Sequence, residues 1–288
     1  MYFHCGNVTK IIGIISGKGG VGKTTVSANL ALALKKFGKK VIVVDCNLST
    51  PHLAYYLGVS DYKYTLNDAL MGNVEMISAV SSSDGIRYVP ASLQMSDLSG
   101  ISLANFEKNL KTLVNPDKVD YIILDSAPGL GKEALTVLTA CNEVIFVTTP
   151  FAPMVNDVMR CQEILRKIKG TKTIGIVLTM TTNGVHEMSP QSISKLTGAP
   201  VIGEVPFDRN VTYGLVSKSP IMNYDPDSLA SIGFMQLAAN LTGKEYIVPA
   251  KMKMYKLMAK VRNTLLPAKV AMPKSIQAVK EDIFIENK

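Results

Sequence analysis

The chain has 288 residues, of which 47% are hydrophobic and 19% charged, so it can bury a full core and is not generally disordered. The length allows one large α/β domain or two small ones. The formal net charge of +8 lies mainly in the tail: residues 251–288 hold nine Lys/Arg and three Asp/Glu, which leaves 22 and 20 for residues 1–250. A nearly neutral body argues against DNA as a partner, and a basic tail points first to an anionic surface.

The four cysteines, Cys5, Cys46, Cys141 and Cys161, are scattered and form no C-x-x-C pair. This spacing argues against a disulfide framework, a zinc site and an iron–sulfur scaffold. It is typical of proteins in a reducing compartment. There is also no secretory signal and no apolar run of roughly 20 residues, so we expect a cytoplasmic protein.

A glycine-rich loop that matches G-x-x-x-x-G-K-[ST] spans Gly17-Lys18-Gly19-Gly20-Val21-Gly22-Lys23-Thr24-Thr25. The apolar run before it, residues 10–16, is typical of a buried parallel strand. Apolar residues spaced like one helix face follow it as far as Gly38. This order of elements aims backbone N–H groups and the positive end of a helix at a phosphate. We therefore predict that the whole loop binds a nucleotide, with Lys23 at the β/γ-phosphates and Thr24 on Mg²⁺.

Two further apolar runs each end in an aspartate. Residues 40–44 lead into Asp45, and residues 119–124 lead into Asp125, with Gly129 four positions later. Ligands bind at the carboxyl edge of a parallel sheet, so both aspartates should lie beside the phosphate loop. Asp-x-x-x-Gly after a strand is also the Walker B and switch II pattern. It predicts Asp125 in the second shell of Mg²⁺ and the Gly129 N–H at the γ-phosphate.

Coarser patterns predict the remaining elements. They are small turns capped at Thr65 and Asn73, a strand at 85–90, a helix at 101–114, a strand at 143–149, a helix at 154–168, a strand at 173–179, a helix at 189–196, a strand at 200–206 and closing helices at 209–220 and 227–242. The alternation of strands and helices predicts an α/β fold. We expect a mainly parallel sheet of about 7–8 strands with helices on both faces.

We expect residues 1–248 to form one catalytic domain and residues 249–288 to form a basic helix and tail. Residues 251–266 contain five basic residues and no acidic one. One helical face carries Met254, Leu257, Met258, Val261 and Leu265. A helix of this kind over 250–266 suits an anionic membrane surface, a contact with the body or a partner, or, least of all, nucleic acid. The first of these would make the protein peripheral at the inner face of the cell membrane.

The second lysine of the loop, Lys18, completes the pattern K-G-G-x-G-K-T-T, and residues 125–129 read Asp-Ser-Ala-Pro-Gly. On these motifs the chain resembles the MinD/ParA family of deviant Walker A P-loop ATPases, most closely archaeal-type MinD. The resemblance extends from residue 10 to about residue 245. It implies a P-loop NTPase fold, ATP/ADP and Mg²⁺ as cofactors, and an ATP-sandwiched homodimer. In that dimer, Lys18 reaches the partner's nucleotide.

The resemblance also assigns roles in switch I, which in the family reads Asp-x-Asp. Asp45 matches the first aspartate, which helps to hold the metal-bound water, so the implied metal set is Thr24, Asp45 and Asp125. The second position, tied to the hydrolytic water, is Asn47 in this sequence. Asparagine brings no negative charge and cannot accept a proton, so we expect slow hydrolysis and a long-lived ATP dimer.

Adenine contacts follow the family pattern less closely. A strand in the family often ends in an asparagine that reads adenine, and Thr179 occupies the matching position. A Pro-x-Asp loop borders the base, and here it would be Pro206 and Asp208. The last two residues are also typical of an ordinary turn.

The resemblance implies an Mg²⁺-dependent ATPase switch for spatial positioning, in cell division or cell-surface machinery, with a protein activator or cargo as partner. The expected catalytic residues are Lys18, Lys23, Asp45 and Asn47. Two alternatives stay open: a regulatory scaffold that binds ATP with little hydrolysis, and a ParA-like partitioning ATPase that binds DNA. The iron–sulfur carriers of the family find no support in a sequence without C-x-x-C.

Overall fold

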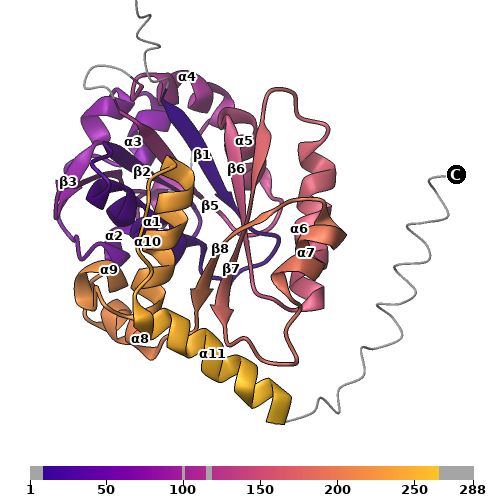
Figure 1. Ribbon diagram of the computed structural model, residues 1–288. Helices are drawn as coiled ribbons and strands as arrows, with labels where there is room; N and C mark the ends of the chain where they lie inside the picture. The colour runs from indigo at the N-terminus through magenta and orange to yellow at the C-terminus, as the bar shows by residue number, and fades with distance from the viewer. Residues whose placement is uncertain (1–8, 99–100, 115–118, 266–288) are drawn as a thin grey trace, which may run out of the picture.

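The computed structural model describes residues 9–98, 101–114 and 119–265 (Figure 1). At its centre lies an eight-stranded sheet with the order β3-β4-β2-β5-β1-β6-β7-β8. Neighbouring strands are parallel except for β3 and β4. The strands are β1 (Lys10–Ile15), β2 (Val41–Cys46), β3 (Ser81–Ser83), β4 (Ile86–Val89), β5 (Tyr121–Ser126), β6 (Glu143–Thr148), β7 (Lys172–Thr181) and β8 (Val201–Pro206). The prediction of a mainly parallel α/β sheet is confirmed.

Helices cover both faces of this sheet (Figure 1). One face carries α1 (Lys23–Lys36), α2 (Leu53–Tyr56), α9 (Ile221–Tyr224) and α10 (Leu229–Thr242), and the other carries α3 (Leu66–Met71), α4 (Phe106–Lys111), α5 (Lys132–Ala140), α6 (Ala152–Leu165) and α7 (Pro190–Thr197). Ile12 and Ile14 of β1 pack in the core between the sheet and the face that carries α1 and α10, whereas Ile11 and Ile15 pack in the core on the opposite face. A strand covered on both faces must be apolar throughout, which is why the strand runs stand out in the sequence.

The region before β5 differs from the sequence-based expectation. Three serines form β3, which pairs antiparallel with β4 through a turn at Asp84 and Gly85, both at positive φ. Serines carry no apolar alternation, so no pattern in the sequence indicates this strand. The helix expected over 101–114 is instead a 3₁₀ turn, Leu103–Asn105, followed by the short α4.

Local capping explains two further outcomes. Thr65 caps α3 in a reciprocal capping box with Asp68, as its sequence spacing favours. The cap expected at Asn73 is wrong, because the following 3₁₀ turn begins after Glu75. The structure also shows α5, which lies directly between switch II and β6 and was not predicted.

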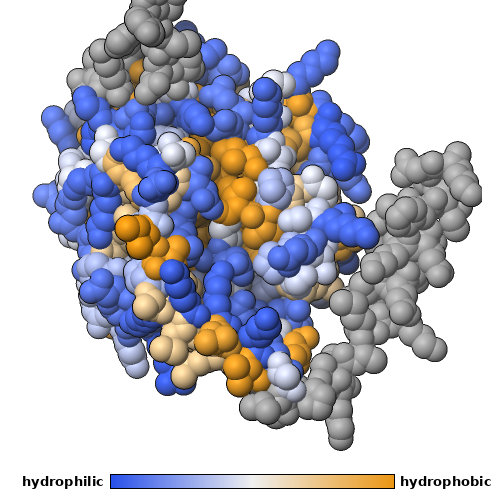
Figure 2. Space-filling model, viewed as in Figure 1, coloured by the Kyte–Doolittle hydropathy of each residue, from blue (hydrophilic) through white to orange (hydrophobic). Residues whose placement is uncertain are grey.

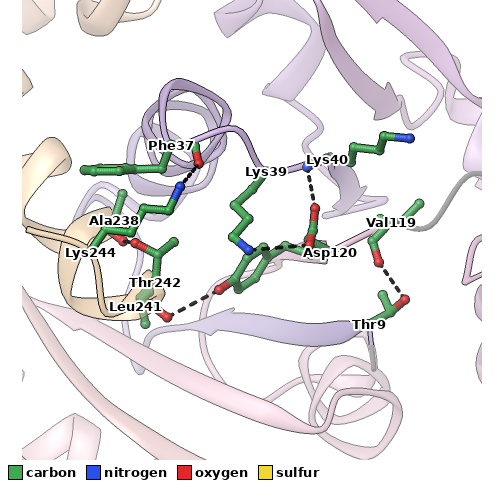
Figure 3. Close-up of polar contacts among 11 residues, drawn as sticks. Thr9, Phe37, Lys39, Lys40, Val119, Asp120, Ala238, Leu241, Thr242 and Lys244 are labelled. Atoms are coloured by element: carbon green, nitrogen blue, oxygen red, sulfur yellow. Dashed lines mark hydrogen bonds and ion pairs between the residues drawn. The ribbon is translucent and has the colours of Figure 1, made fainter. Parts of the chain in front are cut away.

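Polar contacts close the edge of the sheet that lies away from the phosphate loop (Figure 3). The Asp120 carboxylate, just before β5, lies 3.6 Å from Lys39 Nζ and accepts the Lys40 N–H at 2.8 Å. Lys244, which follows α10, donates to the Phe37 carbonyl at 2.7 Å. These contacts fix the carboxyl ends of α1 and α10 against the sheet. The contacts at the carboxyl end of α1 therefore also help to fix the helix whose amino end carries the phosphate loop.

Candidate functional site

The loop between β1 and α1 depends on its glycines. Gly20 and Gly22 have φ angles of 80° and 86°, a left-handed conformation that glycine adopts without strain. Gly17 approaches α6 closely: a Cβ at this position would lie 2.5 Å from the Cβ of Asp157. Within the described part of the chain, no side chain caps the first turn of α1, which begins after Gly22. The N–H groups of that turn are therefore left for an anion at the positive end of the helix.

Side chains from distant strands hold the loop in shape. The Thr179 hydroxyl, at the end of β7, lies 2.7 Å from the Val21 carbonyl oxygen and 3.2 Å from that of Thr148. The Ser16 hydroxyl donates to the Lys18 carbonyl at 2.7 Å. These contacts hold the loop in one shape, so little conformational entropy remains to be lost when a phosphate binds.

Asp45 and Asp125 lie opposite each other at the carboxyl ends of β2 and β5, because the strand register pairs them directly. Each is only 1% exposed. Burial first, and then the charge of Asp125, raises the pKa of Asp45 to about 8. Burial also raises the pKa of Asp125. Two buried carboxylates side by side disfavour joint ionisation, and a cation near them relieves that cost.

The first turns of α1 face Asp125. The Ser27 hydroxyl donates to Asp125 Oδ1 at 2.9 Å, and hydrogen bonds from Thr24 and Ser27 oppose the rise of the Asp125 pKa. Lys23 is buried, which lowers its pKa, although Asp125 works in the opposite direction. The set is made of oxygen donors around two carboxylates, the chemistry that Mg²⁺ prefers. Thr24, Asp45 and Asp125 therefore fit the predicted metal. Ser27 was missed, although it lies one helical turn after Lys23 on the same face.

Switch I is anchored through its first aspartate. The Asp45 carboxylate accepts the Asn47 N–H at 3.1 Å and the Leu53 N–H at 3.0 Å. The Asn47 side chain folds back on its own loop, where its amide donates to the Thr50 carbonyl at 2.7 Å. This is a local turn contact of the kind that asparagine favours. The structure thus brings Asn47 close to Asp45 through the backbone, with its amide engaged.

The remaining predicted residues lie around the loop with other contacts in place. The Gly129 N–H donates to the Ser16 carbonyl at 3.1 Å, so it meets a γ-phosphate only if that bond breaks. Lys18 and Gly19 are exposed at the tip of the loop. The Thr25 hydroxyl donates to the Tyr56 hydroxyl of α2 at 3.2 Å, a contact that the sequence did not indicate.

The residues predicted to contact adenine, at the ends of β7 and β8, take part in contacts within the protein. Thr179 holds the phosphate loop, as described above. The Asp208 carboxylate caps α8 (Arg209–Val216) by accepting the Asn210 N–H at 3.0 Å, and it lies 3.4 Å from the Ala230 nitrogen. Pro206 is buried at the end of β8. Contact of these three residues with a base stays a prediction, and the polar atoms of two are already engaged.

The helix expected in the tail is α11 (Ala250–Leu265), and it packs on the body at the ends of β7 and β8 (Figure 1). Met252 and Ala259 are buried on its inner side. The Tyr255 hydroxyl donates to the Thr181 carbonyl at 3.0 Å. Packing on the body was one of the expected alternatives. It uses a different face from the predicted apolar one, so the helix can serve two contacts.

The apolar face of α11 points to solvent. Met254, Leu257, Met258 and Val261 are 50% to 65% exposed, and Figure 2 shows apolar side chains along the helix with hydrophilic ones beside them. Leu265, expected on the same face, has a side chain outside the described set. Among the residues that the structure describes, no helix is long and apolar enough to span a bilayer.

Comparison with known proteins places this geometry in a family. Residues 7–242 match the family profile described as "ParA: NUBPL iron-transfer P-loop NTPase". An uncharacterized ATP-binding protein of Methanocaldococcus jannaschii is 34% identical over 250 residues, which cover 86% of this chain and 94% of the relative. The cytosolic Fe-S cluster assembly factor NUBP2 of Bos taurus is 30% identical over 254 residues, covering 81% and 92%.

Solved structures that are similar to this chain belong to the same family. The cell division ATPase MinD of Pyrococcus furiosus matches with a TM-score of 0.77 and 30% identity, over 81% of this chain and 98% of that one. The septum site-determining protein MinD of Pyrococcus horikoshii, complexed with Mg-ADP, matches with 0.76 and 30%, over 81% and 96%. The resemblance expected from the loop and switch motifs is confirmed: the chain belongs to the ParA/MinD family of P-loop NTPases.

Proposed function

We propose that this protein is an ATP- and Mg²⁺-dependent ATPase switch that forms an ATP-sandwiched homodimer. The observation that carries the proposal is the pair of buried carboxylates, Asp45 and Asp125, in direct register beside Lys23 and Thr24 at the open end of α1. Buried like charges are costly unless a cation joins them. A Mg²⁺–nucleotide bound here supplies that cation and meets the N–H groups of the loop.

Each residue of the site has one task in this function. The loop N–H groups and Lys23 bind the phosphates. Thr24, Asp45 and Asp125 would hold Mg²⁺, and the metal would neutralise charge that develops on the phosphate oxygens during transfer. The Gly129 N–H leaves the Ser16 carbonyl for the γ-phosphate, so switch II moves when the triphosphate is present and returns when it is absent.

Lys18 makes the site half of a shared one. Lys18 lies exposed at the tip of the loop, whereas Lys23, at the base of the loop, is buried and only 8% exposed. An exposed lysine beside a bound triphosphate can reach the nucleotide of a second copy. ATP then joins two copies, and hydrolysis releases them.

Asn47 favours slow turnover. Its amide is tied to Thr50, and it has no charge with which to orient or deprotonate a water. We expect Asn47→Asp to raise the single-turnover rate of ATP hydrolysis by about tenfold, because positioned general-base assistance is worth at least that much. Equal rates in the two proteins would contradict this reading. A wild-type rate indistinguishable from buffer would instead favour the regulatory scaffold.

Nucleotide binding itself is tested by calorimetric titration of ATP with and without Mg²⁺. We expect binding by the wild type and a loss of at least about tenfold in affinity without Mg²⁺ or in Lys23→Ala, because a buried cation–phosphate contact is lost. Lys36→Ala, at the exposed far end of α1, is the matched control and should bind like the wild type. Equal affinity of Lys23→Ala and the control would overturn the proposal.

The exposed face of α11 supports a membrane role. Its apolar residues lie between Lys251 on one side and Lys253 and Lys260 on the other, when the sequence is placed on a helix of 3.6 residues per turn. Each lysine near an anionic lipid surface adds about 1 kcal/mol. We therefore propose that the ATP dimer binds an anionic membrane surface through this face.

Flotation with vesicles of phosphatidylglycerol and phosphatidylcholine tests the membrane role. With ATP, the wild type should float, and Leu257→Gln/Met258→Gln should stay in the load fraction. Lys36→Ala serves as the matched control, and a chain ending at residue 248 gives the baseline. Flotation of the double variant equal to that of the wild type would refute the role of the face.

Iron transfer, the activity in the description of the family profile, finds less support. Cys46, Cys141 and Cys161 are buried in the described part of the chain. Burial raises the pKa of the Cys141 thiol to about 12 and that of Cys161 to about 11. A cluster needs thiolates that it can reach, so these three favour packing over metal binding.

A further inference from the structure

A hollow of about 410 Å³ lies where the carboxyl ends of α6 and α7 meet, on the sheet face that these helices cover. The first residues of β7 and the turn before β8 complete its lining. These strands run parallel to β1, so the hollow lies at the edge of the sheet opposite the phosphate loop. A cavity of this size can hold a small molecule or the end of a peptide.

One buried polar side chain in the hollow has no partner. Gln162 of α6 is only 8% exposed and lines the hollow. Its side-chain amide makes no hydrogen bond to any residue that the structure describes. An amide withdrawn from water without a partner is unfavourable, and buried amides are nearly always paired. This amide is therefore available to a molecule that enters the hollow.

Two further hydrogen-bond donors line the hollow. Arg166 is the C-cap residue of α6 and follows Gln162 by four positions, so both lie on one side of the helix. The Arg166 guanidinium and the Thr173 hydroxyl likewise have no polar partner within the described part of the chain. None of the described residues that line the hollow is acidic. This donor set suits an anion, and the flat guanidinium fork matches a carboxylate.

The segment beside the hollow is positively charged. Residues 163–172, which connect α6 to β7, contain one exposed acidic residue, Glu163, and four exposed basic residues, Arg166, Lys167, Lys169 and Lys172. The carboxyl ends of α6 and α7 contribute about half a negative charge each. The net charge of +3 on the segment exceeds that contribution, so the local potential favours an anion.

Apolar residues form another part of the lining: Leu165, Ile168, Ala199 and Pro200. The hollow thus combines donors for an anion with a surface for an apolar group. A molecule with a carboxylate at one end and a short apolar body uses both, whereas inorganic phosphate uses only the donors.

We propose that this hollow is a binding site for a carboxylate with a short apolar body, supplied by a free small acid or by the C-terminus of a peptide. The Arg166 guanidinium holds the carboxylate, the Gln162 amide donates to one of its oxygens, and Leu165 and Ile168 contact the body. The site lies apart from the nucleotide, so this inference does not depend on the proposed function.

Nuclear magnetic resonance titration of the ¹⁵N-labelled full chain tests the proposal. The probes are N-acetyl-leucine, its uncharged amide, inorganic phosphate and the peptide N-acetyl-Ala-Ala-Leu with a free C-terminus, each up to about 20 mM. We expect N-acetyl-leucine to bind with a Kd on the order of 1 mM, as its size allows. It should shift the side-chain NH₂ signal of Gln162, which is the signal missing from Gln162→Leu. The amide and phosphate should bind at least about tenfold more weakly.

Three variants separate binding from folding. Arg166→Ala changes an exposed residue and should weaken N-acetyl-leucine by about tenfold. Lys167→Ala removes a neighbouring cation outside the lining and should bind within about twofold of the wild type. Gln162→Leu should weaken binding by about fivefold, yet it should melt at or above the wild-type temperature, because no hydrogen bond within the protein is lost.

Tighter binding of the peptide than of N-acetyl-leucine would support the site and identify a chain terminus as the source, and equal affinity would support it with a free acid. Three results would each overturn the inference: no binding of N-acetyl-leucine or the peptide, equal binding of the acid and its amide, or wild-type affinity in Arg166→Ala. None of them would affect the proposed function.

Discussion

The buried carboxylate pair makes the stability of the ligand-free protein depend on pH. Asp45 has a folded-state pKa of about 8 and an ordinary value of 3.8. Between these values the folded state binds a proton that the unfolded state does not. The free energy of unfolding therefore falls as the pH rises through this window. The perturbation that isolates the effect is Asp45→Asn, which removes the ionisable group.

The magnitude follows from the raised pKa of Asp45. Between pH 6 and pH 8, a group with a folded-state pKa of about 8 costs about 2 kcal/mol of stability. For a chain of this size, that corresponds to a fall of roughly 5 °C in melting temperature. Asn cannot accept both backbone N–H groups that Asp45 accepts, so the absolute stability of the variant also changes. The slope against pH is therefore the quantity to read.

Differential scanning calorimetry in EDTA, at half-unit steps from pH 6 to pH 8, measures both proteins. We expect a falling melting temperature for the wild type and a shallower slope for Asp45→Asn, because the variant lacks the carboxyl group that loses its proton in this window. Saturating Mg²⁺–ADP should flatten the wild-type slope, because a bound cation favours the ionised pair. Parallel slopes in EDTA would refute the reasoning.

Three further changes test the packing of the site. Gly17→Ala places a Cβ 2.5 Å from the Cβ of Asp157, and we expect it to lower the free energy of unfolding by about 1 to 3 kcal/mol in urea titrations; no change would contradict the close approach. Thr179→Val conserves volume and loses the contact with Val21, so we expect a loss of about 1 to 3 kcal/mol and weaker ATP binding by calorimetry; unchanged affinity would show that the contact does not shape the loop. Lys256→Ala breaks the 3.0 Å ion pair with Glu204, in which the two side chains are 46% and 23% exposed. It should lower the free energy of unfolding by less than about 1 kcal/mol. A larger loss would mean that α11 is essential to the fold.

The sequence predicted the strand–loop–helix unit well because its signals are local. The glycine spacing, the apolar run before it and the helical period after it all lie within residues 10–38. The two aspartates were also predictable, because each ends an apolar run and parallel strands present their carboxyl ends on one edge. Their direct register, which adds to the effect of burial in raising the pKa of Asp45, depends on strand order and became visible only in the sheet.

Other features depend on contacts between distant parts of the chain. The hydroxyl of Thr179 and the carbonyl of Val21 are 158 positions apart in sequence, so no spacing rule connects them. The shift in strand register at Met180 comes from the pairing of β7 with β8 rather than from a turn motif. The pattern of α11 predicted one apolar face but not which side meets the body, where Met252 and Ala259 are buried.

The sandwich dimer is the central claim, and size-exclusion chromatography with light scattering tests it most directly. The chain has a mass of 31.2 kDa, so we expect that mass with ADP and twice that mass with ATP and Mg²⁺. Lys18→Ala should bind ATP and stay a monomer, because it removes the lysine that reaches the second nucleotide. A wild-type monomer under every condition, with ATP bound, would contradict the account.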